Sequence, residues 1–186
     1  MNARDAAIHR GLEAKTMLDA PQLGWLYDLA QRAPDGPAVE TGVYRGGSLV
    51  TWAAAREGRG RIIAVDTWSS DKAPPTLRDL FMLNMKRCSI PIELLEVNSW
   101  EAPALIKEPV AFCFIDSDHG IYGIPRDILT WPDAIMPGGI LAFHDYDVWK
   151  PTVVVQCIVD AWALLSEWED LGLVGSAKAY RKPERK

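Results

Sequence analysis

The chain has 186 residues, 48% of them hydrophobic and 24% charged, which is the composition of a soluble globular domain with a sizeable core. Its formal net charge of −5 argues against a nucleic-acid partner, because polyanions are bound by basic surfaces. The sequence contains no run of about 18 apolar residues, as a membrane span requires, and its start lacks the apolar stretch of a signal peptide. We therefore expect one domain over residues 1–186 in the cytoplasm, with no membrane partner.

Two helices are predicted at the N-terminus. Residues 3–18 place apolar side chains on one face, and Asp19 can cap a second helix with Pro21 in its first turn. We expect these N-terminal helices, residues 1–33, to cover a sheet edge or the mouth of a site. Their apolar faces also suggest a homodimer.

Short apolar strands alternate with helical segments over residues 37–186. Strands are expected at 38–40, 61–65, 92–97, 110–115 and 140–143. Helices are expected at 49–56, at 76–88, at 100–107 with Ser99 as the cap, from Pro125 onward, and from Pro151 to about Ser166, where the helix is apolar nearly all round and should be covered. Two last strands, 168–174 and 177–181, should form a hairpin. The alternation predicts an α/β fold: a Rossmann-like, doubly wound, mostly parallel seven-stranded sheet with helices on both faces and a C-terminal antiparallel hairpin.

Two of these strands end abruptly in carboxylates and imidazoles. The fourth runs into Asp116-Ser-Asp-His119, and the fifth, after a turn at Pro137-Gly-Gly139, runs into His144-Asp145. Ligands of open α/β sheets bind at the C-terminal ends of strands, so these residues mark a candidate site: Asp116, Asp118, His119, His144 and Asp145. Structural roles are the alternatives, with Asp116 as a cap, His119 ordering the turn at Gly120, and His144–Asp145 as a hydrogen-bonded pair.

A glycine-bearing turn follows the first strand. Glycines at 42, 46 and 47 let the backbone approach a ligand, and the helix N-terminus after them favours an anion. Asp66 ends the next strand at the spacing where an acid meets ribose hydroxyls in dinucleotide folds. The G-x-G-x-x-G fingerprint is absent, and Glu40 would repel a pyrophosphate and favour an ammonium group. The pattern indicates a nucleoside that carries an amino acid; the alternative is a strand–turn–helix without a ligand.

Four motifs follow one another in the chain: Glu40-Thr-Gly-Val-Tyr-Arg-Gly-Gly-Ser48, Ala64-Val-Asp-Thr-Trp68, Ile115-Asp-Ser-Asp-His119, and Pro137-Gly-Gly with His144-Asp-Tyr146. Together they resemble the class I S-adenosylmethionine-dependent methyltransferases. Within that class the chain is similar to the small O-methyltransferases of the macrocin and rhamnosyl O-methyltransferase group and to the cephalosporin-hydroxylase-like proteins. The resemblance spans residues 37–147.

The resemblance implies a site for S-adenosylmethionine. Its first motif faces the methionine part, the acid after the second strand holds the ribose, and the loop after the third strand lies beside the adenine. The implied cofactor-binding residues are Glu40, Gly42, Tyr44, Ser48, Asp66, Thr67, Trp68, Asn98, Ser99 and Asp116.

The resemblance also implies a second, reactive half of the site. Metal-dependent members bind a divalent ion, usually Mg²⁺, at the positions of Asp116, His144 and Asp145. Asp118 matches a proposed general base, and His119 and His144 could also take a proton from a hydroxyl. Several relatives have a carboxylate at the position of His144. A His/Asp/Asp set suits a transition metal better than Mg²⁺, or His144 acts as a base.

The function implied by the resemblance is methylation of a hydroxyl on a small metabolite, a sugar or a natural product, with or without a metal. Methyl transfer from a sulfonium is an in-line displacement, for which the protein mainly supplies positioning. Two alternatives remain. A metal-dependent hydrolase using the Asp/His cluster leaves Glu40 and Asp66 without a role, and a non-catalytic nucleotide-binding protein could share the fold.

Overall fold

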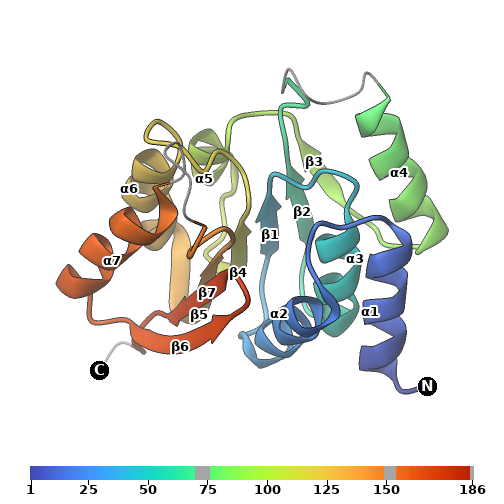
Figure 1. Cartoon of the computed structure of the whole chain (residues 1–186), viewed down its shortest axis with the longest axis horizontal. Coiled ribbons are helices and arrows are strands. Elements are labelled where there is room, and N and C mark those ends of the chain that lie inside the picture. Colours follow the sequence, from blue (N-terminus) through green and yellow to red (C-terminus); the bar gives the residue numbers. More distant parts are fainter. Residues whose placement is uncertain (70–75, 149–153, 185–186) are drawn as a thin grey trace.

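The computed structural model describes residues 1–69, 76–148 and 154–184. One seven-stranded sheet runs through the molecule in the order β3-β2-β1-β4-β5-β7-β6 (Figure 1). Five strands pair in parallel: β1 (Ala38–Thr41), β2 (Ile62–Val65), β3 (Glu93–Leu95), β4 (Val110–Ile115) and β5 (Ile135–Phe143). The hairpin of β6 (Glu169–Val174) and β7 (Ala177–Arg181) adds to β5 through an antiparallel β7. The predicted fold class is confirmed.

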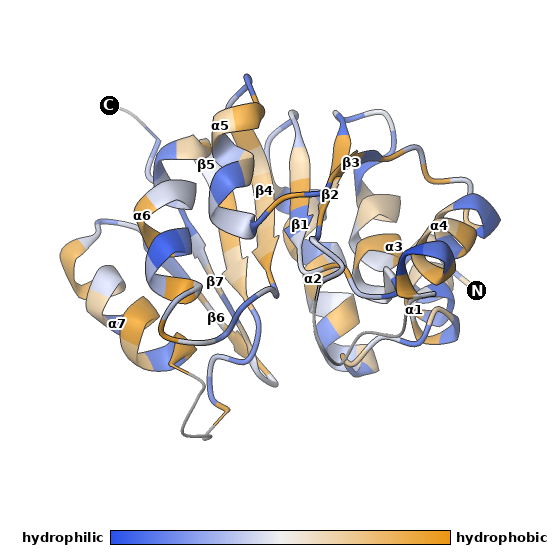
Figure 2. Ribbon diagram, turned by 90° about the horizontal axis from the view of Figure 1, so that it is seen from above, coloured by the Kyte–Doolittle hydropathy of each residue, from blue (hydrophilic) through white to orange (hydrophobic). Residues whose placement is uncertain are grey.

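Helices cover both faces of this sheet, as the view from above in Figure 2 shows. One layer contains α2 (Ala20–Arg32), α3 (Gly47–Ala53) with the 3-10 turn η1 (Ala54–Arg56), and α4 (Leu77–Arg87). The opposite layer contains η2 (Ser99–Glu101), α5 (Ala102–Leu105), α6 (Ile124–Ala134) and α7 (Val155–Leu165). Because successive strand side chains point to opposite faces, Phe112 and Phe114 of β4 enter the first core, and Cys113 and Ile115 enter the second.

The N-terminal helices pack on α3. Asp19 caps α2 as predicted, in a reciprocal capping box with Gln22. The first helix, α1 (Ala3–Glu13), ends earlier than the predicted residue 18, before Lys15 adopts a left-handed backbone with a φ of 67°. Both helices contact α3, and the homodimer suggested by their apolar faces stays a prediction.

Two local predictions were wrong. The short helix after β3 is not capped by Ser99; Asn98 precedes it, and the Glu101 carboxylate accepts hydrogen bonds from the backbone and side chain of Asn98. The Pro137-Gly-Gly139 segment does not lie outside the fifth strand. β5 begins at Ile135, and the register between β4 and β5 shifts at this segment, so that the three residues form an irregular part of the strand.

Helix α7 is less covered than its composition suggested. Val155 and Val159 are buried against the second core, but Leu164 and Leu165 are 87% and 91% exposed. The helix lies in an outer layer (Figure 1), so only one side of it meets the sheet. The predicted start at Pro151 lies outside the described residues. No helix formed by the described part of the chain is long and apolar enough to cross a membrane.

Candidate functional site

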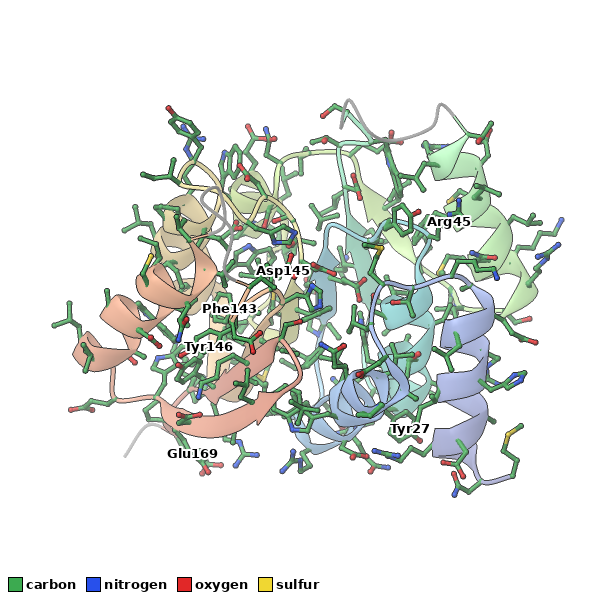
Figure 3. All side chains as sticks on the ribbon, viewed as in Figure 1. Tyr27, Arg45, Phe143, Asp145, Tyr146 and Glu169 are labelled. Carbon is green, nitrogen blue, oxygen red and sulfur yellow. The ribbon has the colours of Figure 1, made fainter. Side chains whose placement is uncertain are left out.

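The carboxyl ends of β4 and β5 are neighbours in the sheet and bring three predicted site residues together. Asp116 follows β4, and His144 and Asp145 follow β5; Figure 3 shows Asp145 near the middle of the molecule. His144 Nδ1 lies 3.0 Å from Asp116 Oδ1 and 3.4 Å from Asp145 Oδ1. One ligand atom from each residue lies within 4.8 Å of the others. Two carboxylates and an imidazole at this spacing fit a divalent cation.

The surroundings of His144 act on its pKa in opposite directions. Burial lowers the pKa of the ring, but the hydrogen bond with Asp116 and the negative charges of Asp116 and Asp145 together raise the pKa of His144 above its ordinary value. His144 is 8% exposed. A proton on His144 is therefore held between carboxylates in a largely dry site.

The turn after β4 separates the other two predicted residues. His119 joins the cluster, with Nε2 3.3 Å from Asp145 Oδ2 and 3.9 Å from Asp116 Oδ1. Its Nδ1 is buried and has no hydrogen-bond partner among the described residues. Asp118 is exposed, and its Oδ1 accepts the backbone N–H of Gly120 at 2.8 Å. The structure thus brings His119 to the cluster and leaves Asp118 at its rim, ordering the turn.

Glu40, at the end of β1, is completely buried. Ser48 Oγ donates to Glu40 Oε1 at 2.6 Å, and Trp52 Nε1 donates to Oε2. Burial raises the pKa of Glu40 to about 8, although these two hydrogen bonds lower it. The hydroxyl of Ser48, one of the implied cofactor-binding residues, is thus engaged by Glu40.

Gly42 connects the two halves of the site. Its φ is 77°, and a Cβ built on it would lie 2.1 Å from the backbone oxygen of Asp116. Its N–H donates to the carbonyl of Val65 at the end of β2 at 2.8 Å. The turn after β1 therefore presses against the turns that follow β2 and β4, which only a residue without a side chain allows.

Asp66 follows β2 and receives two backbone N–H groups. Trp68 N lies 2.8 Å from Asp66 Oδ1, and Tyr44 N lies 3.4 Å from Oδ2. Burial raises the pKa of Asp66, and the backbone hydrogen bonds oppose that shift. The ring of Trp68 packs against that of Phe81 at a tilt of 44°, with 5.3 Å between the ring centroids, and its buried Nε1 has no partner among the described residues. Thr67 is exposed and its hydroxyl lies 2.7 Å from that of Ser69.

A second polar cluster lies beneath the loop after β3. Trp131 Nε1 donates to Ser99 Oγ at 3.2 Å, and Ser117 Oγ donates to Asp127 Oδ2 at 3.4 Å. Asp127 lies in the first turn of α6, where a solvated charge would be expected, but it is fully buried. Burial raises the pKa of Asp127 to about 7. Asn98 faces the surface, bonded to Glu101.

A cavity of about 850 Å³ lies away from all these residues, at the starts of β2 and β3, and its lining includes Arg10, Ile62 and Cys88. None of the predicted site residues lines it. Since open α/β sheets bind ligands at the opposite, carboxyl ends of their strands, we place the site at the Asp116 cluster.

A comparison with protein families matches residues 39–146, more than half of the chain, to the family described as methyltransferase domain. The chain belongs to this methyltransferase-domain family. The match begins in β1 and ends just after Asp145, so it contains every predicted site residue. A comparison with curated proteins finds no match.

Solved structures share the fold of this methyltransferase domain. The O-methyltransferase TomG from Streptomyces achromogenes, involved in tomaymycin synthesis and in complex with S-adenosylmethionine, is 17% identical with a TM-score of 0.68, over 98% of this chain and 90% of that one. An O-methyltransferase from Bacillus cereus in complex with S-adenosylhomocysteine is 20% identical with a TM-score of 0.67, over 97% and 90%. An rRNA methylase from Streptococcus thermophilus is 15% identical with a TM-score of 0.63, over 91% and 100%. At these identities the similarity shows the fold alone.

Several residues of the site were not predicted from sequence. Trp52 donates to Glu40, and Ser117, next to Asp116, accepts a hydrogen bond from Thr41. Ser176 contacts His144, and Gln22 reaches His144 through Ser176. Of these contacts, only that between Trp52 and Glu40 could have been found from the sequence. The two residues are 12 positions apart, and a strand, a turn and a short helix of that length can bring a helix side chain back to the end of the strand. The other contacts depend on long-range packing.

Proposed function

We propose that the methyltransferase domain transfers the methyl group of S-adenosylmethionine to a hydroxyl of a small metabolite, such as a sugar or a natural product. The family match and the shared fold support the reaction class. The observation that carries the proposal further is the contact of Gly42 with Asp116, because it joins a turn suited to the donor with a turn suited to the acceptor. The chain's net charge of −5 argues for a small acceptor over nucleic acid.

The donor half of the proposed site consists of the turns after β1, β2 and β3. We assign Glu40 to the ammonium group of the donor, since a buried acid gains a favourable partner from a nearby cation. Asp66 would receive the ribose hydroxyls, and the loop at Asn98 and Ser99 would lie beside the adenine. The buried N–H of Trp68, which has no partner in the described part of the chain, fits a site that a polar ligand completes. When bound, the donor supplies an electrophilic methyl group on a sulfonium.

The acceptor half consists of Asp116, His119, His144 and Asp145. These residues would hold the hydroxyl in line with the methyl group and take up its proton. His119 is the preferred proton acceptor over Asp118, because it contacts the cluster and its Nδ1 has no partner among the described residues. Asp116, Asp145 and His144 have the donor types to hold a divalent ion, which would polarise the hydroxyl.

Calorimetric titration of the chain with S-adenosylhomocysteine tests the donor half. We expect binding in the parent and a clear loss of affinity in Asp66→Asn, whose side chain keeps its size but loses its charge. A parent chain that binds no S-adenosylhomocysteine would contradict the proposal. Transfer of labelled methyl groups from S-adenosylmethionine to a panel of hydroxylated metabolites then tests the acceptor half.

The hydrolase alternative predicts a different pattern. A hydrolase would cleave ester or phosphoester substrates with a divalent ion and without S-adenosylmethionine, and Asp66→Asn would leave its activity unchanged. Methyl transfer abolished by Asp66→Asn would exclude that alternative. A non-catalytic protein would bind S-adenosylhomocysteine and transfer no methyl group to any acceptor.

A further inference from the structure

Gln22 and Ser176, which lie 154 positions apart in the chain, meet beside His144. Gln22 Nε2 lies 3.0 Å from Ser176 Oγ, and Ser176 Oγ lies 3.1 Å from His144 Nε2. The carbonyl of Ser176 also accepts the N–H of Tyr146 at 2.9 Å, which ties the hairpin to the segment after β5. Both Gln22 and Ser176 lie outside the residues that match the methyltransferase family, so the two ends of the chain add to the site.

The start of α2 determines which end of the Gln22 amide faces Ser176. Gln22 Oε1 accepts the backbone N–H of Asp19 at 3.0 Å, within the capping box. The amide nitrogen must therefore face Ser176, and it can only donate. Gln22 is 7% exposed. Gly175, with a φ of 57°, leaves room for it, because a Cβ there would lie 2.8 Å from Gln22 Nε2.

The carboxylates of Asp116 and Asp145 determine which nitrogen of the His144 ring carries the proton. His144 Nδ1 faces Asp116 Oδ1 at 3.0 Å and Asp145 Oδ1 at 3.4 Å. An ionised carboxylate only accepts hydrogen bonds, so Nδ1 carries a proton. In the neutral ring Nε2 is then an acceptor, and Ser176 must donate to it. The Ser176 hydroxyl can do so, because it uses a lone pair to accept from Gln22 and keeps its proton for His144.

We propose that Gln22 and Ser176 are positioning residues that hold the neutral His144 ring as the Nδ1–H tautomer. One directional chain of hydrogen bonds runs from the Asp19 N–H through Gln22, Ser176 and His144 to Asp116. It turns Nδ1 towards the carboxylates and occupies the lone pair of Nε2. His144 is thereby a support for Asp116, and its Nε2 is not a free proton acceptor. A divalent ion on Asp116 and Asp145 would compete with the Nδ1 proton, so the metal-free chain is the sample for the test.

Nitrogen NMR of the histidine rings reads the tautomer directly. The chain contains three histidines, and the signals that vanish in His144→Gln belong to His144. In the ¹⁵N-histidine-labelled, metal-free parent we expect a protonated Nδ1 and an unprotonated Nε2 in the neutral His144 ring. A parent ring with its proton on Nε2 would overturn the proposal.

Gln22→Glu is the decisive variant. It keeps an oxygen for the Asp19 N–H, since glutamate suits this position of a capping box, but it replaces the donor to Ser176 by an acceptor. Ser176 then donates to the new carboxylate, and Nε2 keeps a hydrogen bond to Ser176 only by carrying a proton in addition to the one on Nδ1. We expect a majority of His144 rings with a protonated Nε2; unchanged signals would overturn the proposal.

Asp19→Ala is the matched control, because it removes the other half of the capping box and leaves the Gln22 amide in place. It should lower the melting temperature without altering the His144 signals. A His144 shift in Asp19→Ala as large as that in Gln22→Glu would show that the effect is only structural and would overturn the proposal.

A kinetic test of the role of Ser176 rests on the proposed function. Ser176→Ala should lower kcat on the order of ten-fold, as is common when a residue behind a site ligand is lost, while the affinity for S-adenosylhomocysteine stays unchanged. An unaltered kcat would contradict the role of Ser176. Absence of S-adenosylhomocysteine binding in the parent would instead count against the proposed function, and it would leave the tautomer measurement valid.

Discussion

The α-carbon of Gly42 lies so close to the backbone of Asp116 that a methyl group on it would approach the Asp116 carbonyl oxygen to 2.1 Å. The two residues follow neighbouring strands, β1 and β4, which pair in parallel. This contact sets the spacing between the turn that we assign to the donor and the turn that we assign to the acceptor. Several measurable consequences depend on it and on the buried groups around it.

Replacing Gly42 by Ala should destabilise the chain by about 3 kcal/mol, because the new methyl group meets backbone atoms that cannot move away and the left-handed φ disfavours a side chain. Gly58→Ala is the matched control: its φ is 71°, and a Cβ there meets nothing within 4 Å. That variant should cost only about 1 kcal/mol. Equal urea-unfolding losses for the two variants would show that the Gly42–Asp116 contact imposes no constraint.

The affinity for S-adenosylhomocysteine should increase with pH below 8. Burial raises the pKa of Glu40 to about 8, so the side chain is largely protonated at neutral pH in the ligand-free chain. A ligand ammonium group favours the ionised form, and binding therefore releases a proton. We expect the dissociation constant to fall by about ten-fold per pH unit towards 8.

Calorimetry in buffers of different ionisation enthalpy checks this proton release. Glu40→Gln should bind more weakly and should lose the pH dependence, because its amide does not ionise. A pH dependence that persists in Glu40→Gln would assign the proton to another group.

The stability of the chain should fall as pH rises from about 4 to about 7 through the contribution of Asp127. Burial raises the pKa of this carboxyl from 3.8 to about 7 in the folded chain, so the folded state holds its proton more tightly than the unfolded state does. The stabilisation is complete below the unfolded pKa and disappears as pH passes the folded one. Asp127→Asn should reduce this slope in urea unfolding measured across the range. Asp133→Asn, which changes an exposed carboxylate of the same helix, should leave the slope unaltered.

Binding of Mn²⁺ should depend on Asp116 and Asp145 and not on Asp118. Asp116→Asn and Asp145→Asn each remove an anionic ligand from the cluster, and we expect each to weaken Mn²⁺ binding by about ten-fold or more. Asp118→Asn keeps the oxygen that accepts from Gly120 and should bind Mn²⁺ as the parent does. Electron paramagnetic resonance of free Mn²⁺ measures all three. A parent chain without affinity for Mn²⁺, Mg²⁺ or Zn²⁺ would remove the metal from the proposal.

Methyl transfer should be more sensitive to His119 than to Asp118. Loss of a general base costs about a hundred-fold or more, which we expect for His119→Asn in single-turnover assays. Asp118→Asn retains the turn and should stay within a few-fold of the parent, since Asp118 is exposed and bonded to Gly120. The reverse order would restore Asp118 as the base, as the sequence resemblance implied.

The strands, the helices and the chemistry at the strand ends could be predicted from the sequence. Val110–Ile115 is a continuous apolar run because both faces of β4 are buried, and it ends where Asp116 begins. The alternation of such runs with helical segments is a local signal, and it determined the sheet and the placement of Asp116, His144 and Asp145 at one edge.

Only the tertiary structure decided how these groups are held. Asp118 and His119 are adjacent in sequence, but the turn directs His119 to the cluster and leaves Asp118 exposed. Asp127 has the position of a solvated first-turn charge and is buried, and Leu164 and Leu165 belong to an apolar helix and are exposed. Gln22 and Ser176 meet at His144 across 154 positions. Such burial and such hydrogen bonds form only when segments distant in the sequence pack together. Hydrophobic periodicity is a local signal, and it reports only which face of a single segment is apolar.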